Sequence, residues 1–96
     1  MAGEVVVCSF DTVAQGVLAE ALSRGLRIPQ DLAVMGFGDL SSAAHTYPPL
    51  STMRVDGPRI GCAIADALLA RFAEPAAARQ PLRLDVGFEL IERGSA

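Results

Sequence analysis

Residues 4–37 of the chain, EVVVCSFDTVAQGVLAEALSRGLRIPQDLAVMGF, decide its fold. The first part, Glu4–Phe10, is a β-branched apolar run, which is typical of a buried strand. Thr12–Gln15 has the spacing of a capping box and predicts the start of a helix that should stop before Gly25. Leu32–Phe37 is apolar again and predicts a second strand, so the order implies a right-handed parallel βαβ unit. The expected apolar stripe of the helix consists of Val13, Val17, Leu18, Ala21 and Leu22.

The rest of the chain predicts one more helix and two more strands. Leu50–Val55 has the composition of a third strand, and a helix over Gly57–Phe72 should follow with Asp56 as its N-cap. After an Ala- and Pro-rich linker at 74–80, Leu82–Ile91 alternates partly and predicts a terminal strand. The fold class is therefore α/β with a parallel sheet. Because a parallel sheet needs cover on both faces and two short helices give little, we expect the chain to be part of a larger α/β domain.

The composition excludes several classes of protein. The chain has 96 residues, of which 51% are hydrophobic and 20% charged, so it can bury a core. The net charge of −3 and the lack of a Lys/Arg run exclude a basic nucleic-acid clamp. No apolar run is long enough to span a membrane, and the N-terminal MAGEVVV lacks the basic region of a signal peptide. Cys8, Cys62 and His45 form no metal-ligand set, so neither a metal nor a cofactor is expected. Both cysteines are expected to be small buried residues in a reducing, cytosolic setting.

Two kinds of chemical site are partly matched by the loop after the second strand. Gly36–Gly38 resembles the start of a phosphate-binding GxGxxG motif, but the third glycine is missing and a Pro-Pro pair follows where a helix should run. Ser41 or Ser42, with His45 and Asp39, supplies the residue types of a catalytic triad. Neither serine lies in the GxSxG sequence of a nucleophile elbow.

A third kind is a ligand site at the carboxyl ends of the strands, where open parallel sheets bind their ligands. Asp11 and Asp39 each follow a predicted strand, so their carboxylates would converge there. Each also has a simpler explanation, because Asp is common at helix starts and in turns. Arg54 and Asp56 flank the exit of the third strand and would form a surface ion pair. The residues alone leave these alternatives open.

The order of the segments from Val5 to Ser95 resembles the C-terminal part of a LacI/GalR-type transcriptional regulator. CSFDT corresponds to the family's Cys/Ala-x-Asn-Asp turn, GLRIPQD to G-hydrophobic-x-x-P-x-D and VMGFGD to V-x-G-F-D-D. PPLSTM corresponds to P-x-L-T-T-V, and IERGS to the closing hydrophobic-x-R-E-S. The GFGD variant with AAHTYPPLSTMRVD is most similar to gluconate-utilisation repressors within that family.

The resemblance implies a periplasmic-binding-protein-like α/β effector domain with two subdomains around a ligand cleft. Residues 1–54 and 82–94 would belong to the C-terminal subdomain, and the helix over 57–72 would pack in the other subdomain. The protein would be a cytoplasmic, homodimeric repressor without catalytic residues, and it would bind a small-molecule effector. It would contact operator DNA only through an N-terminal domain absent from these 96 residues, and no membrane is implied. A sugar-binding protein of a transport system and a small α/β hydrolase remain as alternatives.

The resemblance also assigns residues by position match. The expected ligand-binding residues are Phe10, Asp11, Gly38, Asp39, Gly57 and Ile60. The expected dimer interface consists of Gln15, Leu18, Ala19, Leu22, His45 and Thr46. Two of these positions depart from the family pattern, because Phe10 replaces an Asn and Gly38 replaces the first acid of G-F-D-D. A cleft that lacks this carboxylate is better suited to a sugar acid such as gluconate than to a neutral sugar, since carboxylates repel each other when buried together.

Overall fold

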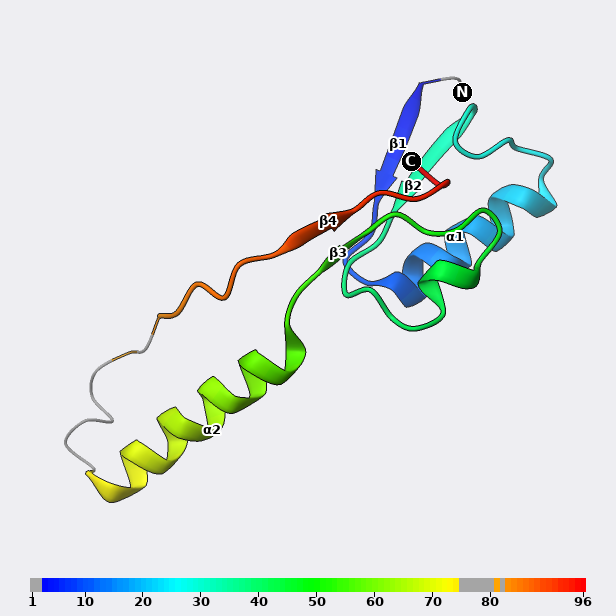
Figure 1. The fold of residues 1–96 in the computed structure, drawn as a ribbon. Coiled ribbons are helices and arrows are strands. Elements are labelled where there is room, and N and C mark those ends of the chain that lie inside the picture. The colour runs from blue at the N-terminus through cyan, green and yellow to red at the C-terminus, as the bar shows by residue number, and fades with distance from the viewer. Residues whose placement is uncertain (1–2, 75–80, 82) are drawn as a thin grey trace. The chain divides into compact units, whose positions relative to one another are not determined.

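A computed structural model describes residues 3–74, 81 and 83–96 (Figure 1). The chain forms two compact units, and each is described by itself. The first contains residues 3–54 and 89–96, and the second contains residues 55–88. No helix among the described residues is long and apolar enough to cross a membrane.

The first unit begins with the predicted parallel βαβ arrangement. Strand β1 (Glu4–Val7) pairs in parallel with β2 (Leu32–Met35), and helix α1 (Asp11–Ser23) connects the two strands. The core of this unit consists of Cys8, Ala14, Leu18, Ala21, Leu32, Val34, Ala43 and Leu50. Burial in this core raises the pKa of the Cys8 thiol.

The prediction that the first strand is buried is wrong. Val5 and Val7 of β1 are 60% and 69% exposed, whereas Val6 packs against the core. Successive strand residues point to opposite faces of a sheet, so Val6 faces the core and its two neighbours face the other side. Among the described residues, nothing buries that second face.

The predicted capping box at the start of α1 is also wrong. The helix begins at Asp11, its N-cap is Phe10, and no side chain caps it. Thr12 therefore lies inside the first turn instead of preceding it. The predicted stop is confirmed, since Gly25 has φ +76° and its N–H donates to the carbonyl of Leu22.

Strand β3 (Thr52–Arg54) is shorter than predicted, and it is connected to β2 by one parallel bridge. Ser51, just before it, forms a parallel bridge with Met35 of β2. A short 3₁₀ helix, η1 (Ala43–His45), precedes β3 and was not expected from the sequence.

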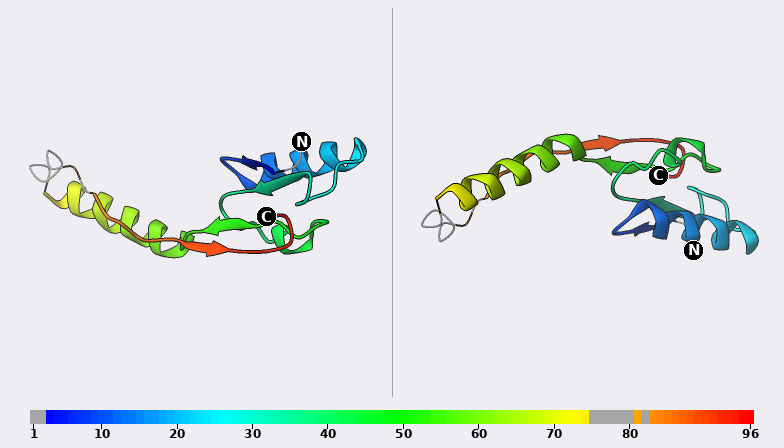
Figure 2. Two further views of the ribbon diagram at one scale, coloured as in Figure 1. Left: turned by 90° about the horizontal axis from the view of Figure 1, so that it is seen from above. Right: turned by 90° about the horizontal axis from the view of Figure 1, so that it is seen from below.

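The terminal strand is much shorter than the predicted Leu82–Ile91. Strand β4 (Glu89–Ile91) runs antiparallel beside β3 in every view (Figures 1 and 2). Residues 83–88 form no strand, because no backbone in the described part of the chain pairs with them. Leu82 and the predicted linker residues 75–80 lie outside the described residues.

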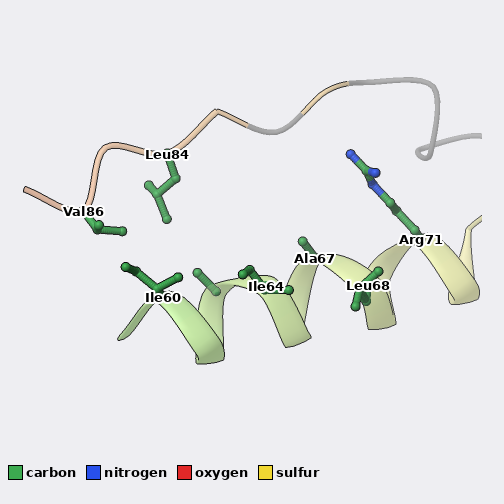
Figure 3. Close-up of a pocket in the computed structure, with 8 residues that line it drawn as sticks. Ile60, Ile64, Ala67, Leu68, Arg71, Leu84 and Val86 are labelled. Atoms are coloured by element: carbon green, nitrogen blue, oxygen red, sulfur yellow. The ribbon is translucent and has the colours of Figure 1, made fainter. Parts of the chain in front are cut away.

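The second unit contains helix α2 (Gly57–Ala73) and the segment that returns beside it. The predicted N-cap is confirmed, because the N–H of Arg59 donates to the Asp56 carboxylate at 3.0 Å. None of the residues of α2 is buried, and Cys62 is exposed, contrary to its predicted burial. One apolar stripe of α2 faces Leu84 and Val86 across a groove of about 460 Å³ (Figure 3).

Candidate functional site

The carboxyl ends of three strands meet in the first unit. The turn at Phe10 and Asp11 follows β1, the loop with Gly38 and Asp39 follows β2, and Arg54 is the last residue of β3. Backbone hydrogen bonds join these ends, because the N–H of Asp11 donates to Phe37 and the N–H of Gly38 donates to Met53. The structure thus brings four of the six predicted ligand residues to the edge where open parallel sheets bind their ligands.

Asp11 is fully buried and links the start of α1 to the loop after β2 and to the first residue of β3. Its Oδ2 accepts a hydrogen bond from the N–H of Leu40 at 2.7 Å, and its Oδ1 accepts one from the hydroxyl of Thr52 at 2.6 Å. Its carboxylate lies so close to Gly36 that a Cβ at that position would collide with it. Both oxygens of Asp11 therefore have partners within the chain, and its observed role is to hold the site together.

Asp39 is held between two arginines. Its Oδ2 lies 2.7 Å from Nε of Arg54, and its Oδ1 lies 3.0 Å from Nη2 of Arg93. The backbone of Asp39 has φ +56°, a conformation that Asp tolerates better than most residues. Burial opposes ionisation of Asp39 most strongly, but the hydrogen bonds and charges of Arg54 and Arg93 together outweigh it and lower the pKa of Asp39.

Gly38 and Phe10 form the open part of this edge. Gly38 has φ +119°, which residues with a side chain rarely adopt. Apart from its chain neighbours, the only described residue within contact range of a Cβ added at Gly38 would be Phe10, whose ring lies 4.0 Å away. Phe10 itself is 51% exposed. The acid that the family pattern has at position 38 would therefore meet backbone strain in this conformation.

Two residues of the site were not identified from the sequence. Thr52 contacts Asp11, and Arg93 pairs with Asp39 while its Nη1 donates to the carbonyl of Leu50. Arg93 matches the arginine of the closing hydrophobic-x-R-E-S motif, which could have drawn attention to it, but nothing local indicated its partner 54 positions earlier. The predicted ion pair between Arg54 and Asp56 is wrong, because Arg54 pairs with Asp39 and Asp56 caps α2.

The other two predicted ligand residues belong to the second unit. Gly57 is the first residue of α2 and is exposed, and Ile60 lines the apolar groove of that unit. Their participation in a common ligand site stays a prediction.

Five of the six residues predicted for the dimer interface lie around one surface groove. This groove of about 240 Å³ is lined by Gln15, Leu18, Ala19, Leu22, Thr46 and Tyr47. The side-chain amide of Gln15 donates to the hydroxyl of Ser42 at 2.7 Å, which ties α1 to the loop before η1. Leu18 is only 3% exposed because it packs into the core, whereas Leu22 is 38% exposed. The sixth residue, His45, is exposed at the end of η1.

The arrangement gives no support to a catalytic triad or a metal site. Within the described part of the chain, no hydrogen bond joins the imidazole of His45 to Ser41 or Ser42, and Ser42 is bonded to Gln15 instead. A triad needs its base within hydrogen-bond reach of the nucleophile. The described residues also contain no group of three or more His, Cys, Asp or Glu side chains that could hold a metal ion.

Comparisons with known proteins agree on one family. Residues 4–96 match the periplasmic binding protein-like domain. The HTH-type transcriptional regulator GntR of Pseudomonas aeruginosa is 44% identical over 85 residues, which cover 88% of this chain and 24% of the relative. The crystal structure of the transcription regulator GntR from Chromobacterium violaceum has a TM-score of 0.74 and 35% identity over 95% of this chain and 33% of that one. The complex of the transcriptional regulator CelR with cellobiose has a TM-score of 0.86 and 27% identity over 96% of this chain and 28% of that one.

The chain thus spans about a quarter of the length of the curated relatives it matches. All three relatives named above are transcriptional regulators, and the predicted parallel α/β fold class is confirmed. The chain belongs to the periplasmic binding protein-like domain family, in the form found in LacI/GalR-type transcriptional regulators.

Proposed function

We propose that this chain is the effector-sensing and dimerising part of a cytoplasmic DNA-binding transcriptional repressor. Its role is regulatory and not catalytic, and its effector is a sugar acid similar to gluconate. Operator DNA would be bound through a separate domain, since this chain carries a net charge of −3 and no basic run.

The observation that carries the choice of effector is the use of the two carboxylates. Each oxygen of Asp11 and of Asp39 already has a hydrogen-bond or ion-pair partner inside the chain. Neutral sugars are commonly held by carboxylates that accept hydrogen bonds from their hydroxyls. An edge whose carboxylates are occupied by Thr52, Arg54 and Arg93 offers donors more readily than acceptors, and this favours a ligand with a negative charge.

The relatives support this choice only in part. The name GntR belongs to the Pseudomonas and Chromobacterium proteins, and cellobiose, a neutral sugar, is bound by CelR. For this chain, two observations favour a sugar acid over a neutral sugar. One is the resemblance of GFGD to gluconate-type regulators, and the other is that the carboxylates of Asp11 and Asp39 already have partners.

The mechanism follows from linkage between two conformations. An effector changes DNA binding only if it has different affinities for the DNA-binding and the released state. The chain passes from the first unit to the second after Arg54 and returns before Glu89. A ligand bound at the strand ends beside Arg54 would therefore act next to both connections and could favour one conformation over the other.

The effector proposal is tested by isothermal titration calorimetry on the full-length protein. Gluconate is expected to bind and to release the protein from operator DNA, whereas glucose at the same concentration should do neither. Tight binding of neutral hexoses without binding of aldonates would contradict the proposed effector.

The dimer proposal is tested at Leu22, because its side chain is partly exposed and lines the groove beside Thr46 and Tyr47. Leu22→Glu in the full-length protein should shift the sedimentation coefficient from dimer to monomer at low micromolar concentration, because it places a charge in an apolar contact. Val13→Glu is the matched control, since Val13 is also exposed on α1 but lies outside this groove. A Leu22→Glu protein that stays as dimeric as Val13→Glu would rule out this groove as the interface.

A further inference from the structure

We propose that Arg54 binds the carboxylate of the effector and so determines specificity for a sugar acid over the neutral sugar. This inference rests on the proposed function and assigns the recognition of the charged group to one residue.

The two arginines that hold Asp39 differ in how many of their donors are used. Arg93 is 17% exposed, and it is committed to Asp39 through Nη2 and to the carbonyl of Leu50 through Nη1. Arg54 is 49% exposed and contacts Asp39 through Nε. In the described part of the chain, its other close partner is the exposed Glu89, whose Oε2 lies 3.7 Å from Nη1. Arg93 is therefore a structural residue, whereas Arg54 keeps N–H donors for a ligand.

Asp39 also orients the guanidinium of Arg54. Nε of Arg54 donates a hydrogen bond of 2.7 Å to Oδ2 of Asp39, which fixes one edge of the planar guanidinium. Arg93 holds the other oxygen of the same carboxylate, Oδ1. The outer nitrogens of Arg54 are thus held in place before any ligand arrives. A preoriented guanidinium loses less conformational entropy on binding and matches a carboxylate with two parallel hydrogen bonds.

The position of Arg54 fits a ligand site. Arg54 ends β3, which a parallel bridge between Ser51 and Met35 joins to β2, and ligands of open α/β sheets bind beyond the carboxyl ends of their parallel strands. Its partner Asp39 follows Gly38, which has no side chain, and the Phe10 ring lies 4.0 Å from the place where a Cβ would be. The opening at Gly38 and the apolar ring of Phe10 give the carbon chain of a sugar acid a surface next to the cation.

The carboxylate of Glu89 lies near Arg54, where the carboxylate of the ligand is proposed to bind. It approaches Nη1 of Arg54 at a distance too long for a strong hydrogen bond, and the Glu89 side chain is 70% exposed. A ligand carboxylate would replace this weak contact with short, charge-assisted hydrogen bonds. Removing Glu89 should therefore strengthen binding of the anion, while removing Arg54 should weaken it.

The test compares gluconate with gluconamide, which differs from it in having a neutral amide in place of the carboxylate. Calorimetry on the full-length protein should show that the wild type prefers gluconate. Arg54→Gln should weaken gluconate binding by roughly 10- to 100-fold and leave gluconamide within about twofold, as expected for the loss of hydrogen bonds to a charged group. The matched control is Arg24→Gln, because Arg24 is also an exposed arginine of the first unit and pairs with Glu20. This control should change neither the affinity for gluconate nor the affinity for gluconamide.

Glu89→Gln gives a second readout, because this substitution leaves the ion pair between Arg54 and Asp39 in place, whereas Arg54→Gln removes it. Glu89→Gln should tighten gluconate binding by about two- to fivefold without affecting gluconamide, since it removes one competing charge at an exposed site. An Arg54→Gln protein that keeps its preference for gluconate, or a Glu89→Gln protein with unchanged affinity for it, would overturn the role of Arg54 and leave the proposed function intact. Wild-type protein that binds glucose but no gluconate would overturn the proposed effector and this inference together.

Discussion

The two helices of the chain, α1 and α2, are similar in composition and apolar pattern but differ in how much of their surface is buried. Both are rich in Ala and Leu, and each carries an apolar stripe with helical period. Helix α1 buries four residues, Asp11, Ala14, Leu18 and Ala21, whereas α2 buries none. The difference teaches that amphipathic period predicts a helix but not what covers it, because burial depends on a tertiary partner.

The same contrast separates the aspartates at the starts of the helices. Asp56 stands outside α2 and caps it through its own backbone neighbour Arg59. Asp11 is the first residue of α1 and uses its carboxylate to bind Leu40 and Thr52, which are remote in the sequence. A short-range signal identified the first role, and only the packed unit created the second.

The largest test of this contrast replaces one leucine in each helix. Leu18→Ala in the 96-residue chain should lower the free energy of unfolding by about 3 kcal/mol, because it leaves a cavity in the core of the first unit. Leu69→Ala, at a position of α2 that is 65% exposed, should change it by less than about 0.5 kcal/mol. Urea denaturation followed by circular dichroism measures both, and equal costs would refute the contrast.

The second test exchanges the two aspartates for asparagine. Asp11→Asn should destabilise the chain by about 2 kcal/mol, since a neutral amide would replace the charged carboxylate that accepts hydrogen bonds from the Leu40 N–H and the Thr52 hydroxyl. Asp56→Asn should cost less than about 0.5 kcal/mol, because Asn is as good an N-cap as Asp. Thermal unfolding curves separate the two outcomes. A neutral Asp11→Asn would show that Asp11 acts only as a helix-start residue.

The third test uses one glycine from each unit. Gly38→Ala should cost about 1–2 kcal/mol, because φ +119° is unfavourable for a residue with a Cβ. Gly61→Ala, inside α2 with open space around the new methyl group, should stabilise its helix by about 0.5–1 kcal/mol. Denaturation midpoints of the two variants should move in opposite directions. A Gly38→Ala protein as stable as the wild type would contradict the positive φ.

The smallest effect concerns pH in the first unit. Hydrogen bonds from the side chain and backbone of Arg27 lower the pKa of Asp31 to about 2. Because this folded-state pKa lies below the unfolded value of about 3.9, the pair stabilises the chain fully above that value and the contribution is lost as pH falls through about 2. The effect on stability is modest, because Arg27 in the ion pair with Asp31 is largely exposed to solvent and the contribution is lost only at strongly acidic pH. NMR titration of the Asp31 carboxyl should give the low pKa, and Asp31→Asn should remove the corresponding part of the acid transition.

Most elements of the fold were predictable because their signals are local. The β-branched run of β1, the apolar run of β2, the Gly25 stop and the Asp56 cap each depend on a few neighbouring residues. The errors occurred where a partner decides the outcome. Among the described residues, no element lies on the side of the sheet that Val5 and Val7 face, so these side chains are exposed. Residues 83–88 likewise form no strand, because no described backbone segment pairs with them.

The candidate site was predictable only as a location. Asp11 and Asp39 follow successive strands, and parallel strands place their carboxyl ends at one edge, so their convergence followed from the order of the elements. The partners of these carboxylates did not follow, since Thr52, Arg54 and Arg93 reach them from 15 to 54 positions away.

By itself, the sequence determined the order of strands and helices, the parallel βαβ start, and the family to which the chain belongs, because periodicity, caps and motifs are properties of short segments. Only the tertiary structure decided that Asp11 is buried and hydrogen-bonded to Leu40 and Thr52, and that Gly38 has a positive φ. It also decided that Arg93 uses its donors within the chain, whereas Arg54 is partly exposed and keeps donors for a ligand. These outcomes depend on distances between segments far apart in the chain. Such distances are set by how the strand ends pack together and are not encoded in any one segment.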